Sequence, residues 1–304
     1  MPFNKQHFSI DGNYIRRRIP DILLYTARIL FLGIVGYIVL YPLLYMIITA
    51  LKDKNALLDM EHIWVPVSYT FHNFQQAYEI MNFGNAFKQT LSVQILSAAI
   101  EVFVCSFIAY GFARFEFKGK APLTLLLIVS LLVPIQMYSL SLAVNFRNLH
   151  IFNTPFVYWL PSLFGVGIRS GMLIFIYQQF FISLPKELED AAYIDGAGPV
   201  KTFFKIALPS SSVVITTVSV LSFVWHWNEY YLATLTFLQE DAPLATVMNF
   251  LDVYLQQIGI YNGWPQYSVL VSAACLMYIL VPLILYMIFQ RKFVRSIDRV
   301  GITG

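Results

Sequence analysis

The side chains that could do chemistry in this 304-residue chain do not form a familiar catalytic arrangement. The five histidines are scattered, and only His226 borders a long apolar run. Catalysis would need a nucleophile beside a base, or several clustered metal ligands. The chain contains no Walker A, HExxH or GxSxG motif. We therefore expect no catalytic residue, no metal site and no cofactor bound by this chain, and an intramembrane enzyme is disfavoured.

Polar residues recur instead at helical spacing around one apolar run near residue 220. Steps of three or four place them on one helical face, which should point away from lipid because buried polar groups need partners. For the hydroxyl residues, helix packing is the ordinary alternative. For His226, Asn228 and Glu229, a solute pathway and a structural hydrogen bond remain equally open. The face consists of Ser212, Thr216, Ser219, Ser222, His226 and Glu229.

A second polar face follows Thr90, Gln94, Ser97, Glu101 and Cys105. A carboxylate near the middle of a membrane costs about 2.5–3.5 kcal/mol on insertion scales, so such a residue usually pairs or lines a cavity. Glu101 is accordingly either a structural partner, with Arg169 as one candidate, or a pathway residue. Gln136 follows Pro134, which opens a helix locally, and with Tyr138 it is a further pathway candidate.

The elements that must position these residues are long apolar helices. The composition is 58% hydrophobic and 12% charged, whereas charged residues make up about 25% of an average soluble protein. A membrane-spanning helix needs about 20 apolar residues. We predict an all-α membrane protein with six transmembrane helices, at 29–51, 90–112, 121–144, 160–181, 208–227 and 267–290. The predicted divisions are a cytoplasmic segment 1–28, a membrane domain 29–290 and a cytoplasmic tail 291–304.

The distribution of lysine and arginine predicts the orientation. With both termini cytoplasmic, fifteen of the twenty basic residues lie in cytoplasmic segments, as the positive-inside rule requires. The net charge of +3 therefore reflects topology, and it gives no indication of nucleic-acid binding. The other five are Lys52, Lys54, Lys88, Arg147 and Arg169.

Residues 185–206, the coupling segment, connect the fourth and fifth predicted spans. Acidic residues fall in the first turn of a predicted short helix, where they complement the helix dipole. Gly196 is suited to end that helix, and Gly198-Pro199 begins a second one. Ala191 and Ala192 have small side chains, so another protein could approach this surface closely. An ordinary loop with capped helices would have a similar sequence, and this alternative stays open. The acids are Glu187, Glu189, Asp190 and Asp195.

This segment resembles the EAA loop of permeases from binding-protein-dependent ABC importers. The family pattern is Glu-Ala-Ala, three residues, Gly, nine residues and Ile-x-Leu-Pro. The chain matches it with Asp190-Ala191-Ala192, Gly196 and the run ending in Leu208 and Pro209, and it departs only in the aspartate. Trp227-Asn228-Glu229, the run 133–136 and the run 178–185 are also similar to the carbohydrate-uptake branch, including the smaller permease subunit of maltose importers.

The resemblance implies a function and a set of partners. The EAA segment would dock on an ATPase subunit, and closure of two ATPases would switch the spans between inward-facing and outward-facing states. ATP and Mg would be held by those ATPases. The other implied partners are a second permease subunit, expected to be a different chain, an extracellular solute-binding protein and a sugar. The chain would lie in the bacterial plasma membrane. The C-terminal residues 301–304 lack the lysine of the family's usual tail, which puts a tail contact with the ATPases in doubt.

The last external loop, residues 232–266, contains no lysine or arginine. By resemblance, its turn at Tyr261, Asn262, Gly263 and Trp264 faces the solute-binding protein and reaches into its cleft, or serves only as a docking surface. Two other functions stay open at this point: an importer permease for another polar solute, such as a polyol or glycerol phosphate, and an ion-coupled secondary carrier. Carriers usually contain duplicated halves, and no duplication is visible here.

Overall fold

The computed structural model of the chain describes residues 12–53, 56, 64–65 and 68–301. Every regular element in these ranges is helical, and the one extended pairing there is an isolated bridge between Lys52 and Tyr69. The prediction of an all-α protein is therefore confirmed for the described part of the chain.

Three helices are long and apolar enough to cross a membrane. They are Leu24–Leu51 within α1 (Gly12–Leu51), Phe83–Arg114, and Pro265–Gln290 within α16 (Pro265–Gly301). The second is continuous through α3 (Phe83–Gln89), the π-helical η2 (Thr90–Ile95) and α4 (Leu96–Arg114). These helices contain the predicted spans 29–51, 90–112 and 267–290. Helix α1 begins at Gly12 and α16 runs to Gly301, so the described parts of the predicted segment 1–28 and tail 291–304 continue these two helices, and their cytoplasmic position stays a prediction.

The third and fourth predicted spans are each broken into two helices. Residues 121–144 form α5 (Lys120–Ser130), a 3-10 turn η3 (Ile135–Met137) and the start of α6 (Ser139–Asn148). Pro134 has an extended backbone before that turn, so the helix cannot continue through it. Residues 160–181 divide between α7 (Phe156–Leu163) and α8 (Ser170–Ser183), with Gly165 and Arg169 at positive φ between them.

The fifth predicted span, 208–227, begins at a sharp bend. The helical stretch Pro199–Ser210 meets α12 (Ser212–Trp227) at 80°, and the two together would make a fourth span. Pro209 lacks the N–H that would continue the hydrogen-bond ladder, which explains a break here. The stretch before the bend comprises α10 (Pro199–Thr202), the π-helical η4 (Phe203–Ala207) and α11 (Leu208–Ser210). The described chain thus has three helices that are long and apolar enough to cross a membrane, or four if the bent pair counts as one span, whereas six spans were predicted.

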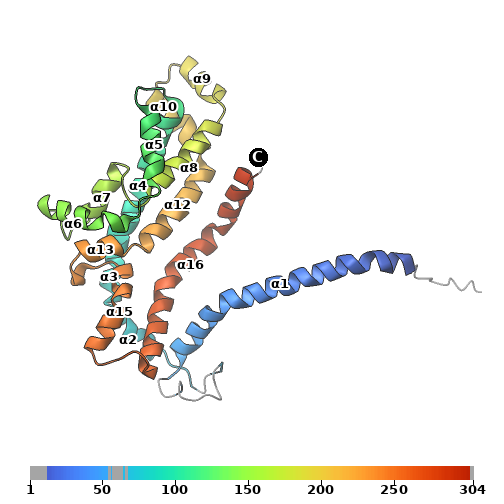
Figure 1. The fold of residues 1–304 in the computed structure, drawn as a ribbon, viewed down its shortest axis with the longest axis vertical. Coiled ribbons are helices and arrows are strands. Elements are labelled where there is room, and N and C mark those ends of the chain that lie inside the picture. The colour runs from blue at the N-terminus through green and yellow to red at the C-terminus, as the bar shows by residue number, and fades with distance from the viewer. Residues whose placement is uncertain (1–11, 54–55, 57–63, 66–67, 302–304) are drawn as a thin grey trace, which may run out of the picture.

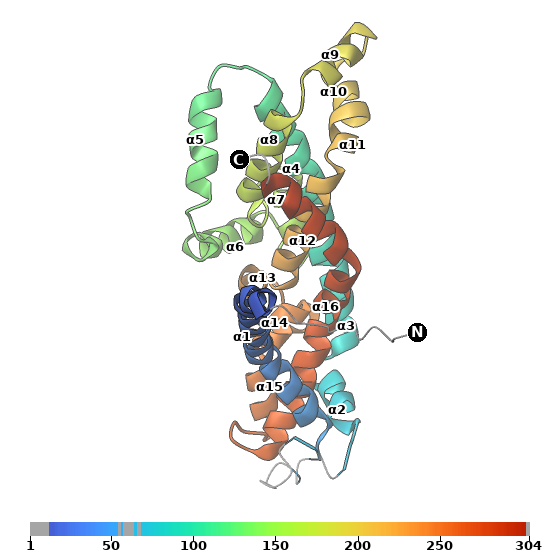
Figure 2. The ribbon, with the colours of Figure 1, turned by 90° about the vertical axis from the view of Figure 1, so that its right-hand side faces the viewer.

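Helix α4 is the centre of the bundle, packing against α7, α8 and α12, while α16 packs on α12 and α2 (His72–Ile80). The views in Figures 1 and 2 show this elongated bundle, with α9 (Glu187–Ile194) and α10 at one end and α2 and α15 at the other. The remaining short elements are α13 (Tyr231–Thr236), η5 (Gln239–Asp241), α14 (Leu244–Asn249) and α15 (Leu251–Gln257).

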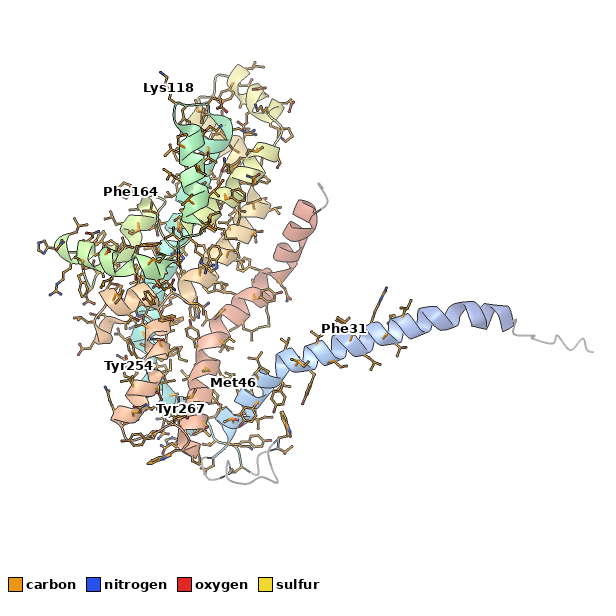
Figure 3. The ribbon with its side chains drawn as sticks, viewed as in Figure 1. Phe31, Met46, Lys118, Phe164, Tyr254 and Tyr267 are labelled. Atoms are coloured by element: carbon orange, nitrogen blue, oxygen red, sulfur yellow. The ribbon has the colours of Figure 1, made fainter. Side chains whose placement is uncertain are left out.

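Helix α1 departs from the bundle over much of its length. Met46 lies where α1 approaches α16, whereas Phe31 lies on the part that extends away (Figure 3). Phe31 is 66% exposed, and many apolar side chains around it are exposed as well. In a membrane, this surface would contact lipid or another subunit instead of water.

Candidate functional site

The coupling segment has the helix–turn–helix form expected from the sequence. Helix α9 starts at Glu187, with Glu187, Glu189 and Asp190 in its first turn, where the helix dipole favours acids. Gly196 has φ +77, a left-handed conformation that glycine adopts without strain. Gly198 is extended, and Pro199 then begins α10 at a position where its missing N–H costs nothing.

Most of this segment is exposed at one end of the molecule. Ala191 is exposed and Ala192 partly so, and Asp190, Asp195 and Gly196 are exposed. Ile194 is 86% exposed, and Leu188, Tyr193 and Val200 are also exposed. A cluster of apolar and small side chains on a projecting element is a surface suited to contact with another protein.

Glu189 differs from the other acids, because it points into the protein. By sequence it belongs with the other acids of this segment, but it is only 4% exposed. Its Oε1 accepts a hydrogen bond from Nε of Arg114 at 2.7 Å, and its Oε2 accepts one from the Tyr110 hydroxyl at 3.0 Å. Arg114 also donates to the backbone carbonyl of Leu184 at 2.7 Å. The start of α9 is therefore attached to the end of α4.

Aromatic packing attaches the second half of the segment to the same part of α4. Phe203 is fully buried, and its ring centroid lies 5.1 Å from that of Phe107 and 5.3 Å from that of Tyr110. Ala207 is also fully buried, while Leu208 is partly buried and Pro209 is exposed beside the 80° bend. Thus both halves of the coupling segment have a rigid base and an exposed outer surface.

A buried polar cluster lies deeper in the bundle around Glu101. The carboxylate accepts hydrogen bonds from the hydroxyls of Ser170 and Ser222, and it lies 3.6 Å from Nε2 of His226. His226 is fully buried and its Nδ1 lies 2.9 Å from the carbonyl of Ser222. The cluster joins α4, α8 and α12. Arg169, the partner considered from the sequence, stacks instead on Trp225, with its guanidinium carbon 5.1 Å from the ring centroid.

Glu229 anchors a second buried polar group. It is 8% exposed, and one carboxylate oxygen accepts from the Tyr158 hydroxyl while the other accepts from the Leu232 backbone N–H at 2.9 Å. These bonds connect the end of α12 with α7 and the start of α13. Asn228 accepts a hydrogen bond from the Tyr278 hydroxyl at 3.1 Å, which connects the same turn to α16.

A cavity of about 1210 Å³ lies among α5, η3, α6, α7, α8 and the end of α12. Of the pathway candidates, Gln136, Tyr138, Asn228 and Glu229 line it. Glu101, Ser222 and His226 are fully buried in the polar cluster and do not line it, and neither does Ser219, which is partly buried. Other lining groups, which the sequence analysis did not assign to the pathway, are Arg169, Trp225, Tyr230 and Tyr231. A pathway predicted from the polar face of a single helix did not include these residues. The cavity lies instead where the third and fourth predicted spans are each divided into two helices.

The turn at Tyr261, Asn262, Gly263 and Trp264 lies at the end of the bundle opposite α9. Figure 3 shows Lys118 at the α9 end and Tyr254 and Tyr267 at the other. Tyr261 and Trp264 are about half exposed, and their ring centroids are 5.5 Å apart. Gly263 has φ +89, so the turn depends on glycine there. Within the described residues, no group of three or more His, Cys, Asp or Glu is placed to hold a metal ion.

Comparison with known proteins identifies the family. Residues 101–299 match the family described as binding-protein-dependent transport system inner membrane component. The chain is 31% identical over 284 residues to the probable ABC transporter permease protein YurM of Bacillus subtilis, covering 92% of this chain and 89% of that one. It is 30% identical to the melibiose/raffinose/stachyose import permease protein MelC of the same organism, covering 86% and 91%.

A solved structure has the same fold. It is a chain of a bacterial ABC transporter involved in the import of the acidic polysaccharide alginate, with a TM-score of 0.75, 18% sequence identity, and coverage of 96% of this chain and all of that one. The family match spans the polar cluster, the cavity and the coupling segment. The chain therefore belongs to the family of inner membrane components of binding-protein-dependent transport systems, the permeases of ABC importers.

Proposed function

We propose that the chain is one of two permease subunits of an ATP-driven saccharide importer, and that residues 185–206 are its coupling element. The observation that carries this proposal is the form of the segment: an exposed small and apolar surface on a base attached to α4 by Arg114 and Glu189. A surface of this kind can transmit the movement of an ATPase to the spans. Ile194, Val200 and Ala191 are the exposed side chains that would contact the ATPase.

The partners in this proposal are a second permease, expected to be a different chain, two ATP-binding subunits that hold ATP and Mg, and an extracellular solute-binding protein. This chain supplies no catalytic residue. A saccharide is the proposed solute because curated relatives such as the melibiose/raffinose/stachyose permease import oligosaccharides. The cavity supports this choice, since it combines amide and hydroxyl groups with aromatic rings, the two surfaces that sugars need.

We infer that the chain crosses the plasma membrane six times with both termini and the coupling segment cytoplasmic. In this arrangement the broken pairs α5–α6 and α7–α8 and the bent fifth helix count as spans, because backbone irregularity is tolerated where it lines a cavity. Basic residues gather near the α9 end, as the positive-inside rule requires. Lys118 lies there (Figure 3), Arg114 is bonded to Glu189, Lys186 directly precedes α9 and Lys201 lies in α10. The turn Tyr261–Trp264 then faces the solute-binding protein.

In the proposed transport cycle, nucleotide and the loaded binding protein each favour one arrangement of the spans. A two-state equilibrium shifts only by the difference in binding free energy between its states, and each tenfold shift requires about 1.4 kcal/mol. The Glu101 cluster would hold α4, α8 and α12 together as one body during this change. The cavity on its flank would receive the solute, with Gln136, Tyr138, Asn228 and Glu229 on its wall.

Co-purification tests the proposal directly. The tagged chain, expressed in its native host, should bring down an ATP-binding subunit and a second permease. In proteoliposomes the complex should accumulate a saccharide only when ATP and the binding protein are both supplied. A chain that accumulates solute alone, driven by an ion gradient, would contradict the proposal.

A further inference from the structure

The charge that the large cavity presents to a solute is positive. Arg169 is the one basic side chain among the lining residues, and Glu229 is the one acidic side chain. Glu229 is 8% exposed, and both of its carboxylate oxygens accept hydrogen bonds from the protein. Arg169 is exposed, and within the described part of the chain its guanidinium makes no hydrogen bond or ion pair. A solute in the cavity would therefore meet an uncompensated cation.

Trp225 lies against this cation. The guanidinium carbon of Arg169 lies 5.1 Å from the centroid of the indole ring, within the range of a cation–π contact. Trp225 is itself partly buried and lines the same cavity. A cation–π contact uses none of the guanidinium's N–H donors, and two of them can pair with two oxygens of one anionic group.

The backbone at Arg169 is an unusual place for an arginine. Its φ is +56, in the left-handed region where a Cβ is strained. Asn82 and Asn153 also have positive φ in this chain, and asparagine is one of the residue types that tolerate it best. Glycine or asparagine would relieve the strain at position 169. An unfavourable residue at such a position is a reason to look for a function of its side chain.

The depth of Arg169 in the bundle is a second reason to look for a function of its side chain. The hydroxyl of the next residue, Ser170, donates to Glu101. Glu101 is eighteen residues after the start and thirteen before the end of the helix Phe83–Arg114, so it lies near the middle of that span. A charged side chain at such depth is costly unless it pairs or lines a solute pathway. Since Glu101 is already bonded to Ser170 and Ser222, the pathway role remains for Arg169.

We propose that Arg169, oriented by Trp225, binds the anionic group of an acidic saccharide as it passes through this cavity. A carboxylate, sulfonate or phosphate on a sugar ring would accept paired hydrogen bonds from the guanidinium edge, while Trp225 and Tyr138 contact the ring's C–H faces. A neutral saccharide offers only hydroxyl oxygens, which bond a guanidinium more weakly than an anionic group does. The inference rests on the proposed function, because it requires that the cavity is the solute pathway.

The test uses the complete importer in lipid nanodiscs, without the binding protein, so that receptor specificity does not enter. The probes are glucose, glucuronate, sulfoquinovose and glucose 6-phosphate, which share a ring and differ in their charged group. Isothermal titration compares wild type with Arg169→Asn, which accepts the left-handed backbone, and with Arg169→Lys, which keeps the charge. The matched control is Arg147→Asn, an exposed arginine in the last turn of α6 that does not line the cavity.

At least one anionic probe should bind wild type tenfold or more tightly than glucose, and the probe that does so identifies the group. Arg169→Asn should reduce that preference to within twofold, with the complex still assembled. Its melting temperature should not fall, because the substitution relieves strain. Arg169→Lys should keep part of the preference, and Arg147→Asn all of it.

Three results would overturn the inference: glucose binding as tightly as every anionic probe, an undiminished preference in Arg169→Asn, or loss of the second permease from that variant. The last would mean that Arg169 pairs with another subunit. In all three cases the wild-type complex can still hydrolyse ATP and import a solute, so these results leave the proposed function standing. Failure of the chain to assemble with any ATPase would instead contradict the proposed function itself.

Discussion

Nε of Arg114 lies 2.7 Å from Oε1 of Glu189, and both side chains are 5% exposed. This ion pair joins the last residue of the long central helix to the first turn of α9. Arg114 also donates a hydrogen bond to the carbonyl of Leu184, so it holds the chain both just before α9 and within the first turn of α9. A displacement of α9 would therefore move α4, which carries Glu101 of the polar cluster and packs on α7 and α8 beside the cavity.

Substitution Glu189→Ala should uncouple the proposed ATPase contact from transport. It leaves the buried guanidinium of Arg114 without its carboxylate, and loss of one partner of a buried pair costs about 3–5 kcal/mol. We expect ATPase co-purification to be retained, because the exposed surface is unchanged, while receptor-stimulated uptake falls at least tenfold. Proteoliposome uptake and ATP hydrolysis measured on the same preparation check this.

The control for Glu189 is Glu187→Ala, which removes an exposed acid from the same turn of α9. It should cost less than about 1 kcal/mol, since exposed charges contribute little. The exchange Arg114→Glu with Glu189→Arg should restore only part of the uptake, because the Leu184 carbonyl then loses its donor. Equal effects of Glu187→Ala and Glu189→Ala would contradict the role given to the buried pair.

Gly196 and Gly198 allow a matched test of the turn between α9 and α10. A Cβ at either position meets nothing within 4 Å, but Gly196 has φ +77 whereas Gly198 has φ −80. Gly196→Val should therefore strain the turn by about 1–2 kcal/mol or more and weaken ATPase co-purification. Gly198→Val should be nearly neutral. If the two variants pull down the same amount of ATPase, the geometry of this turn does not determine docking.

Gly167 brings its backbone close to Glu101, so Gly167→Ala should disturb the polar cluster. Its Cβ would lie 2.8 Å from Oε1 of Glu101 and 2.7 Å from Oγ of Ser162, closer than side chains pack. We expect a loss of about 1–3 kcal/mol from overpacking, seen as a lower melting temperature in detergent. Gly111→Ala is the control within α4, where the added methyl meets nothing within 4 Å. Its melting temperature should hold or rise, and a fall equal to that of Gly167→Ala would count against this account.

Local signals in the sequence predicted the helix–turn–helix form of residues 185–206. The acids, Gly196 and Gly198-Pro199 affect only the backbone within a few residues of their own positions. The ends of α9 and α10 and the turn between them can therefore be predicted from residue propensities alone. The same signals could not show that Glu189 points inward. Which side of an amphipathic helix is covered depends on a neighbour, here the end of α4, that is 75 residues away in sequence.

Apolar length predicted the long helices that contain residues 29–51, 90–112 and 267–290, but it did not show that the third and fourth predicted spans are each divided into two helices. Pro134 was recognised as a point of opening, yet its effect was to divide the third span into α5 and α6. In the fourth span, the left-handed residues Gly165 and Arg169 produce a break that average hydropathy does not detect. The cavity lies at these two breaks, so its wall could not be assembled from the polar face of a single helix. The break also turns Ser170, not its neighbour Arg169, toward Glu101.

The central claim is that this chain converts the action of partner ATPases into solute movement through its coupling segment. The most direct measurement is ATP hydrolysis by the reconstituted complex, with and without the loaded binding protein, in wild type and in Ala191→Trp. The bulky side chain would stand on the exposed alanine surface. We predict stimulated hydrolysis in wild type, loss of that stimulation and of ATPase co-purification in Ala191→Trp, and none by the chain alone. Full stimulation in Ala191→Trp, with the ATPase bound as in wild type, would contradict the claim.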